Sequence, residues 1–577
     1  MNSKRKRIAS AILLMTMSTT IFNTNVFAGG GVSCISVECE GLFKGCCKGD
    51  DGDEHGKTPT TPSSITVNGS GNNVINGSGN NIIINQIQAP VSTKESTDEK
   101  EGHLVIGKEI ENKKIEDIAP IPKDEIKSVT IKNCVTYICE SAFEGCTDLT
   151  SVTIGNGVWS IGENAFSGCT ELTSITIPNS VTYIMNNAFS GCKGLTSITI
   201  PESVTKIGEC AFYDCTGLKE VKIPDSVTKI EDCAFYFCSG LTSINIPDSV
   251  TSIGERAFSG CTGLKEVKIP DSVTSIGKEA FQGCTGLKEV KIPDSVTEIG
   301  EMAFKGCTGL KEVKIPDSVT EIGEMAFKGC TGLTSITIPD SVTEIGEMAF
   351  EGCTGLTSIN VDKGNPNYKS IYGVLFLKDK TKLHTYPASK KATNYTVPDS
   401  VTSIGWCAFA GCKGLTSIDI PNSVTSIGWC AFEGCTGLTS INIPDSVTYI
   451  GGAFEGCTGL TSINIPDSVT YIGESAFAGC TGLKEVKIPD SVTEIDWSAF
   501  SGCTGLKEVT VPDSVTSIGI GAFEGCTGLT SINIPDSVTY IGESAFEGCT
   551  GLKEVTVPKS AKIADNTFDE NTTVHRI

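Results

Sequence analysis

The sequence predicts a β-rich solenoid of about 17 repeats of 23 residues, with a parallel inner sheet, short helical or 3₁₀ turns and one inserted β-hairpin. Within each of two runs, phenylalanine recurs every 23 residues, apart from one step of 22 at Gly451-Gly452, and an apolar strand pattern and a turn signal recur with it. Such self-similarity is typical of stacked units that share one core. The repeat phenylalanines form two runs, and Phe568 marks a degenerate last repeat: Phe143, Phe166, Phe189, Phe212, Phe235, Phe258, Phe281, Phe304, Phe327 and Phe350, then Phe409, Phe432, Phe454, Phe477, Phe500, Phe523 and Phe546.

The repeat that begins at Leu218 shows how one unit folds. Val221 and Ile223 have the period-two spacing of a strand with one buried face. The Pro-Asp pair that follows ends this strand, because proline donates no hydrogen bond to a ladder and Asp favours turns. A second extended segment comes next, and Phe235 lies in a short turn before the next strand.

The residues before the repeats predict an exported protein. Residues 4–7 are basic, residues 8–21 are largely apolar, and small residues precede a cleavage site after Ala28, which together are typical of a signal peptide. The predicted organisation is residues 1–28 signal peptide, 29–56 Cys-rich head, 57–100 low-complexity linker with Asn-Gly-Ser-Gly-Asn-Asn repeats, 101–125 N-terminal cap, 126–361 repeats, 362–398 inserted hairpin, and 399–577 repeats with a C-terminal cap.

An insertion of 36 residues separates the two runs of phenylalanine. Its strand-like segments, residues 370–377 and 382–386, predict a β-hairpin that projects from the solenoid, where repeat proteins often carry binding elements. Aromatic residues gather there and in the next two repeats, so we interpret residues 362–435 as a recognition patch, although packing against the repeat edge explains the tryptophans equally well. The candidate binding residues are Tyr368, Tyr372, Tyr386, Trp406 and Trp429.

The chain has 27 cysteines. Seventeen lie three residues after a repeat Phe, and we expect them to form a buried, reduced column that binds no metal, because stacked parallel thiols do not converge on an ion. Two pairs lie two residues before Phe in adjacent repeats, in a column expected at or near the surface, and are candidate disulfides or separate thiols. The head has four cysteines that predict a disulfide knot, with metal binding beside His55 as the alternative. The possible disulfide residues are Cys210, Cys233, Cys407, Cys430, Cys34, Cys39, Cys46 and Cys47.

Charge and composition exclude several classes of function. The net charge of −23 argues against a nucleic-acid partner. The four histidines are scattered and form no grouping of nucleophile and base, so we expect neither an enzyme nor a cofactor. On the outward strand face, we expect lysines and glutamates to neutralise one another by cross-strand pairing instead of forming an anion site. These residues are Lys268, Lys291, Lys314, Glu266, Glu289 and Glu312.

The repeat between Ile338 and Ile359, Ile-Pro-Asp-Ser-Val-Thr-x-Ile-Gly-x-x-Ala-Phe-x-Gly-Cys-Thr-Gly-Leu-Thr-Ser-Ile, resembles the BspA-like leucine-rich repeat family of bacterial surface proteins. The resemblance covers residues 126–577, including Asn-Pro-Asn-Tyr in the insertion. It implies a leucine-rich repeat solenoid and an association with adhesion, including binding of host matrix proteins such as fibronectin and fibrinogen. We therefore predict a secreted or cell-surface scaffold that binds an extracellular protein or glycan. The alternatives are a structural protein that self-associates through its N-terminal region, and a carrier whose head has an enzymatic or metal role.

Overall fold

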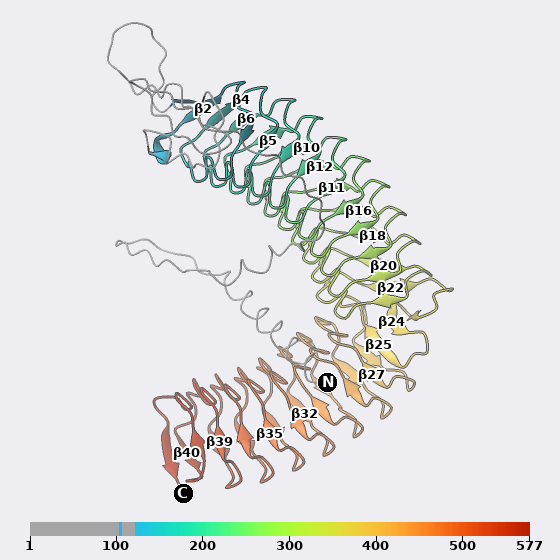
Figure 1. Ribbon diagram of the computed structural model, residues 1–577. Coiled ribbons are helices and arrows are strands. Elements are labelled where there is room, and N and C mark those ends of the chain that lie inside the picture. The colour runs from blue at the N-terminus through green and yellow to red at the C-terminus, as the bar shows by residue number, and fades with distance from the viewer. Residues whose placement is uncertain (1–102, 107–121) are drawn as a thin grey trace, which may run out of the picture. The chain divides into compact units, whose positions relative to one another are not determined.

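The computed structural model describes residues 103–106 and 122–577. In this part of the chain each repeat forms one turn of a parallel β-solenoid, and successive turns stack on one another (Figure 1). Each solenoid coil has three sides. Two of them are strands, and the third is a short hydrogen-bonded turn. The predicted signal peptide, head, linker and most of the N-terminal cap lie outside the described residues.

The first side is a series of parallel strands that begin shortly after the repeat leucine. Hydrogen bonds pair each residue with its equivalent in the next repeat, such as Val221 with Ile244, within successive sheets of two to six strands. The strands are β1 (His103–Ile106), β2 (Ser128–Ile131), β4 (Ser151–Ile154), β6 (Ser174–Thr176), β8 (Ser197–Thr199), β10 (Glu220–Lys222), β12 (Ser243–Asn245), β14 (Glu266–Lys268), β16 (Glu289–Lys291), β18 (Glu312–Lys314), β20 (Ser335–Ile338), β22 (Ser358–Val361), β26 (Asn394–Thr396), β28 (Ser417–Asp419), β30 (Ser440–Ile441), β32 (Ser462–Asn464), β34 (Glu485–Lys487), β36 (Glu508–Thr510), β38 (Ser531–Asn533), β40 (Glu554–Val557) and β42 (Thr573–Arg576).

The second side is a series of two-residue parallel strands that follow the Pro-Asp turn. Each places one isoleucine inward and one polar or tyrosine side chain outward or at the edge, so these strands are short but periodic. They are β3 (Tyr137–Ile138), β5 (Ser160–Ile161), β7 (Tyr183–Ile184), β9 (Lys206–Ile207), β11 (Lys229–Ile230), β13 (Ser252–Ile253), β15 (Ser275–Ile276), β17 (Glu298–Ile299), β19 (Glu321–Ile322), β21 (Glu344–Ile345), β27 (Ser403–Ile404), β29 (Ser426–Ile427), β31 (Tyr449–Ile450), β33 (Tyr471–Ile472), β35 (Glu494–Ile495), β37 (Ser517–Ile518), β39 (Tyr540–Ile541) and β41 (Lys562–Ile563).

The third side is built of turns that contain the repeat phenylalanine. Phe166 N donates to Ala188 O of the next repeat at 2.8 Å, and Cys169 N donates back to Phe166 O at 3.2 Å, so each turn is bonded internally and to its neighbour. Within the described residues the single helix is the 3₁₀ helix η2 (Lys123–Glu125), before the first regular repeat. The predicted short helical segments therefore take the form of hydrogen-bonded turns.

One residue in each of these turns adopts the left-handed backbone conformation. It lies two positions before the repeat Phe and has a φ between 51° and 61°, whether it is a glycine such as Gly452 or a bulkier residue such as Met348. A residue with positive φ cannot continue a right-handed helix, which is why this side turns sharply.

The repeat phenylalanines stack on one another through the core. Their ring centroids lie 5.1 Å apart for Phe143 and Phe166 and 5.9 Å apart for Phe327 and Phe350, with nearly parallel planes. The seventeen cysteines beside them are buried, as predicted. Each thiol after Cys146, which begins the column, donates a hydrogen bond to a phenylalanine or tyrosine carbonyl of the preceding repeat. Burial raises the pKa of the Cys284 thiol to about 12.

The predicted antiparallel hairpin of the insertion is confirmed, but its side chains are buried in the solenoid core, so the prediction that it projects from the solenoid is wrong. It forms the antiparallel strands β23 (Tyr368–Ile371), β24 (Val374–Leu377) and β25 (Lys382–Thr385), and β25 pairs in parallel with β27. The side chains of β24 are buried on both faces: Leu375 packs in the core of the first run, while Val374 and Phe376 pack in the core of the second. Burial of an apolar segment stabilises the folded state, and here the buried segment β24 joins the two cores.

Tyr386 takes the place of a phenylalanine between the two runs. It lies 23 residues before Phe409, its ring is 5.1 Å from that of Phe409, and its backbone N donates to Ala408 O at 2.7 Å. The insertion is therefore an enlarged turn of the solenoid.

The solenoid is extended by a strand at each end of the described segment. At the beginning, β1 pairs in parallel with β2. At the other end, β42 pairs with β40, and Phe568 stacks 5.2 Å from Phe546, so the degenerate repeat continues the core. No helix among residues 103–106 and 122–577 is long and apolar enough to cross a membrane.

Candidate binding surfaces

The outward face of the first strand series forms a groove of about 1050 Å³. Strands β12 to β20 provide its floor, and exposed glutamate, lysine, serine and threonine side chains line it. Each strand places a valine or isoleucine inward, which leaves only the two flanking polar residues for a partner. The floor of the groove is therefore polar and regular.

The charges in this groove are arranged differently from the sequence-based expectation. The register places Glu266 beside Glu289 and Lys268 beside Lys291, and among the described residues no ion pair joins these glutamates to these lysines. Identical repeats in parallel register must place like residues side by side. The predicted cross-strand neutralisation is wrong, and the face carries a glutamate row next to a lysine row.

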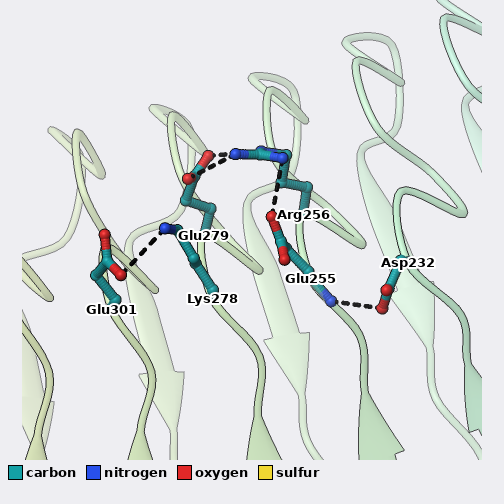
Figure 2. A network of polar contacts seen from close by, with 6 residues as sticks. All are labelled: Asp232, Glu255, Arg256, Lys278, Glu279 and Glu301. Carbon is teal, nitrogen blue, oxygen red and sulfur yellow. Dashed lines mark hydrogen bonds and ion pairs between the residues drawn. The ribbon is translucent and has the colours of Figure 1, made fainter. Parts of the chain in front are cut away.

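The turn edge of the first run carries a chain of ion pairs (Figure 2). Arg256 donates through Nε to Glu279 Oε2 at 2.7 Å and through Nη2 to Oε1 at 2.9 Å, and its Nη1 lies 2.8 Å from Glu255 Oε1. One repeat further, Lys278 Nζ lies 3.1 Å from Glu301 Oε2. The Arg256–Glu279 pair is bidentate and partly buried, whereas the Lys278–Glu301 pair is exposed and is expected to contribute little to stability.

At the same edge of the second run, three repeats carry tryptophan in place of the charged residue, while Glu474 and Glu543 keep the charge. We call the row Trp406, Trp429, Tyr449, Tyr471 and Trp497 the aromatic edge. Trp406, Tyr449 and Trp497 are 36%, 42% and 52% exposed, respectively, while Trp429 and Tyr471 are half-buried. The three tryptophans occupy the position three residues before Phe, where most first-run repeats have Glu, Asp or Lys. Tryptophan and tyrosine dominate binding hot spots, so this replacement marks a candidate binding surface.

The shortened repeat at Gly451-Gly452 brings this row together. A β-carbon at Gly452 would lie 2.8 Å from Trp429 Cε2, and one at Gly451 would lie 2.2 Å from the Tyr449 hydroxyl, so both rings lean over the glycines. Tyr449 stacks on Tyr471 with ring centroids 5.6 Å apart. The missing residue thus provides space that the flanking rings fill.

Asp496 connects the last two members of the aromatic edge. The Tyr471 hydroxyl donates to the Asp496 carboxylate, which also accepts a bond from Trp497 N at 2.7 Å. Burial, followed by this hydrogen bond, raises the pKa of Tyr471 above its ordinary value. These bonds fix the orientation of Tyr471 at the surface.

The five binding residues predicted from the sequence lie in two environments. Tyr372 is 90% exposed at the β23–β24 turn, and Trp406 and Trp429 lie on the aromatic edge. Tyr368 and Tyr386 are buried: the Tyr368 hydroxyl accepts a bond from Ile345 N at 2.8 Å, and Tyr386 belongs to the phenylalanine stack. These two tyrosines therefore support the solenoid from inside.

Sequence reasoning missed the other members of the aromatic edge. Trp497 shares the tryptophan column, a signal that alignment of the repeats would have shown. Tyr449 and Tyr471 precede the inward isoleucine of adjacent second-side strands, and they become neighbours through the stacking.

The two described cysteine pairs lie at the left-handed turn position. Cys407 and Cys430 are 6% and 9% exposed, and Cys233 is 8% exposed, so this column is more buried than the sequence suggested. All four carry thiols in this structure, and the four head cysteines lie outside the described residues.

Comparisons with known proteins agree with the repeat architecture. The model of the BspA type leucine rich repeat region matches six times, over residues 115–241, 183–311, 228–357, 274–394, 382–458 and 452–575. A search of curated proteins gave no match.

Two solved structures are similar to the chain. A leucine rich cell surface protein from Faecalibacterium prausnitzii A2-165 is 37% identical over 61% of this chain and 83% of its own, with a TM-score of 0.46. A leucine-rich repeat protein from Bacteroides ovatus is 27% identical over 84% of this chain and 97% of its own, with a TM-score of 0.43. The family matches together extend from residue 115 to residue 575, and the chain therefore belongs to the BspA-type leucine-rich repeat family.

Proposed function

We propose that this protein is an adhesin of the cell surface or the secreted fraction, which binds an extracellular protein or glycan through its aromatic edge. The observation that carries the proposal is the replacement of charged side chains by Trp406, Trp429 and Trp497 at one repeat position. The export signal predicted in residues 1–28 supports an extracellular location.

The physical basis is the desolvation of large, partly exposed rings. Each tryptophan buries much apolar area on contact and loses little conformational entropy, because its side chain has only two rotatable bonds. Glycan rings and apolar protein side chains both pack against such faces. The polar groove on the strand face offers only small side chains and solvated charges, so we assign it a secondary role.

Binding of the full chain to immobilised fibronectin, fibrinogen and a glycan panel tests the proposal. We expect the wild type to bind saturably. One variant that combines Trp406→Ala, Trp429→Ala and Trp497→Ala should bind with at least about tenfold lower affinity, since a hot-spot residue contributes more than about 1 kcal/mol. The matched control changes Lys278, Glu301 and Glu324, which occupy the same repeat position in the first run, to alanine.

Equal binding by the tryptophan variant and the wild-type chain would contradict the assignment of the site. Absence of binding to every target, together with concentration-dependent multimers in sedimentation, would replace adhesion with self-assembly. The residues on which self-assembly was predicted to depend lie outside the described part of the chain.

A further inference from the structure

Three potential metal ligands converge just after the insertion. Cys407 and Cys430 come from the left-handed turn positions of adjacent repeats, and Glu433 directly follows Phe432. The two sulfur atoms and a carboxylate oxygen of Glu433 all lie within 4.8 Å of one another. Among the described residues this is the single group of three such side chains with that geometry.

The surroundings of this group hold a further carboxylate with an unused oxygen. Glu351 Oε1 lies 2.9 Å from Lys328 Nζ, while Glu351 Oε2 is buried and has no hydrogen-bond partner. Glu351 lies close enough for its charge to act on both Cys407 and Glu433. A buried carboxylate oxygen without a partner is costly, and a cation would satisfy it.

The proximity of Glu351 to this group follows from the insertion. Because Tyr386 is preceded by β25 without the usual left-handed turn, the turn edge between Glu351 and Cys407 lacks one regular corner. The two runs meet there, and side chains that are elsewhere separated by a repeat can face one another.

We propose that Cys407, Cys430 and Glu433 bind a thiophilic divalent cation, represented by Zn²⁺, beside the Glu351 carboxylate. Zn²⁺ binds cysteine sulfur and carboxylate oxygen in tetrahedral sites. Sulfur atoms about 2.3 Å from a tetrahedral ion lie roughly 3.8 Å apart, a separation compatible with ligand atoms that all lie within 4.8 Å of one another. Both thiols release their protons on binding, which makes the affinity depend on pH.

The chain contains an internal control for this proposal. Cys210 and Cys233 occupy the same turn position in two adjacent repeats, but Tyr236 stands where Glu433 does. This pair offers two thiols without the nearby carboxylate. We therefore expect it to bind Zn²⁺ much more weakly than the Cys407 pair.

The proposal is tested on the full chain, reduced and stripped of metal, by titration with Zn²⁺ against a chromophoric chelator. We expect the wild type to bind one equivalent more than the Cys407→Ser/Cys430→Ser variant, and the Cys210→Ser/Cys233→Ser variant to match the wild type. The head cysteines are the same in all three proteins, so any zinc that they bind cancels. Glu433→Gln should weaken this equivalent at least about tenfold, as loss of a ligand weakens a metal site.

Two further measurements keep the test decisive. Co²⁺ should give the visible absorption of a tetrahedral thiolate site in the wild type and lose it in the Cys407 variant, while thermal unfolding shows that each variant is folded. Equal Zn²⁺ stoichiometry in the wild type and the folded Cys407→Ser/Cys430→Ser variant would overturn the proposal. Peptide mapping that finds a Cys407–Cys430 disulfide in the protein as isolated would replace it with an oxidised pair.

Discussion

The ring of Phe237 lies against the backbone of Gly260, one repeat further along the solenoid. Phe237 has a φ of 59° at the position that glycine occupies in most repeats, and a β-carbon at Gly260 would fall 2.3 Å from Phe237 Cδ1. A bulky residue in this conformation is strained. The strain is accompanied by contact with Tyr236, whose ring centroid is 4.2 Å away.

This contact predicts different costs for two equivalent glycines. Gly260→Ala should destabilise the protein by about 2 to 4 kcal/mol, because its methyl group meets the Phe237 ring in addition to the strain of positive φ. Gly283→Ala, with the same backbone and no atom nearer than 3.8 Å, should cost only about 1 kcal/mol. Chemical denaturation measures both. In a Phe237→Gly background the two costs should become equal, and a persistent difference would contradict this account.

Tyr386→Phe should stabilise the protein by about 1 kcal/mol or leave it unchanged, because the Tyr386 hydroxyl is buried without a hydrogen-bond partner. Burial also raises the pKa of Tyr386 to about 12. Tyr368→Phe is the control and should destabilise, since it removes the acceptor of Ile345 N. Thermal unfolding measures both variants, and a higher unfolding temperature for Tyr368→Phe than for Tyr386→Phe would refute the interpretation.

The cysteine column should be chemically inert in the folded chain. At neutral pH, a thiol with a pKa of about 12, as burial gives Cys284, has roughly a thousandfold less thiolate than an ordinary cysteine. Timed alkylation followed by mass spectrometry should therefore label exposed Cys134 long before Cys284. Both should react at similar rates in denaturant, and early labelling of Cys284 in the native protein would show that the column is open.

The insertion should make stability depend on pH through His384. This side chain is buried, and its Nδ1 and Nε2 lie 2.8 Å from Thr385 Oγ1 and 3.4 Å from Ile345 O. Burial lowers the pKa of His384, because the folded protein disfavours the charged ring. The unfolded chain binds this proton near pH 6.5, so stability should fall as the pH is lowered through that value.

Denaturation of wild type and His384→Gln at pH 7.5 and pH 5.5 measures this dependence. The wild type should lose more stability than the variant between the two conditions. The charges nearest His384 are Glu347 and Lys382, which form an ion pair with each other. An equal loss in both proteins would assign the pH dependence to other groups.

Much of the solenoid could be predicted because every repeat has the same pattern of apolar and turn residues. The spacing of phenylalanine identifies the stack, and the apolar residues around Val221 identify the inward face. The left-handed turn was also visible, since Gly452 and Asn164 occupy its column, but the more frequent Ser, Met and Cys residues conceal it. Tyr386 could have been placed in the stack by counting 23 residues back from Phe409.

Other features depend on relationships between repeats that a pattern within one repeat does not contain. The two faces of β24 join two cores only because the insertion lies between them. The convergence of Cys407, Cys430 and Glu433 comes from the stacking of two adjacent repeats, which brings side chains 23 residues apart next to each other. Like charges in the groove follow from parallel register, which pairs Lys268 with Lys291 instead of with a glutamate.

We propose the aromatic edge, not the charged groove, as the binding surface. The most direct measurement compares binding of three full-length proteins to the same immobilised target at low and high salt: the wild type, the combined Trp406→Ala/Trp429→Ala/Trp497→Ala variant, and the combined Lys268→Ala/Lys291→Ala/Lys314→Ala variant. We predict that binding is lost only in the tryptophan variant and changes little with salt, because apolar contacts are not screened. Binding that survives the tryptophan substitutions but falls with the lysine substitutions and with salt would contradict the account and assign recognition to the groove.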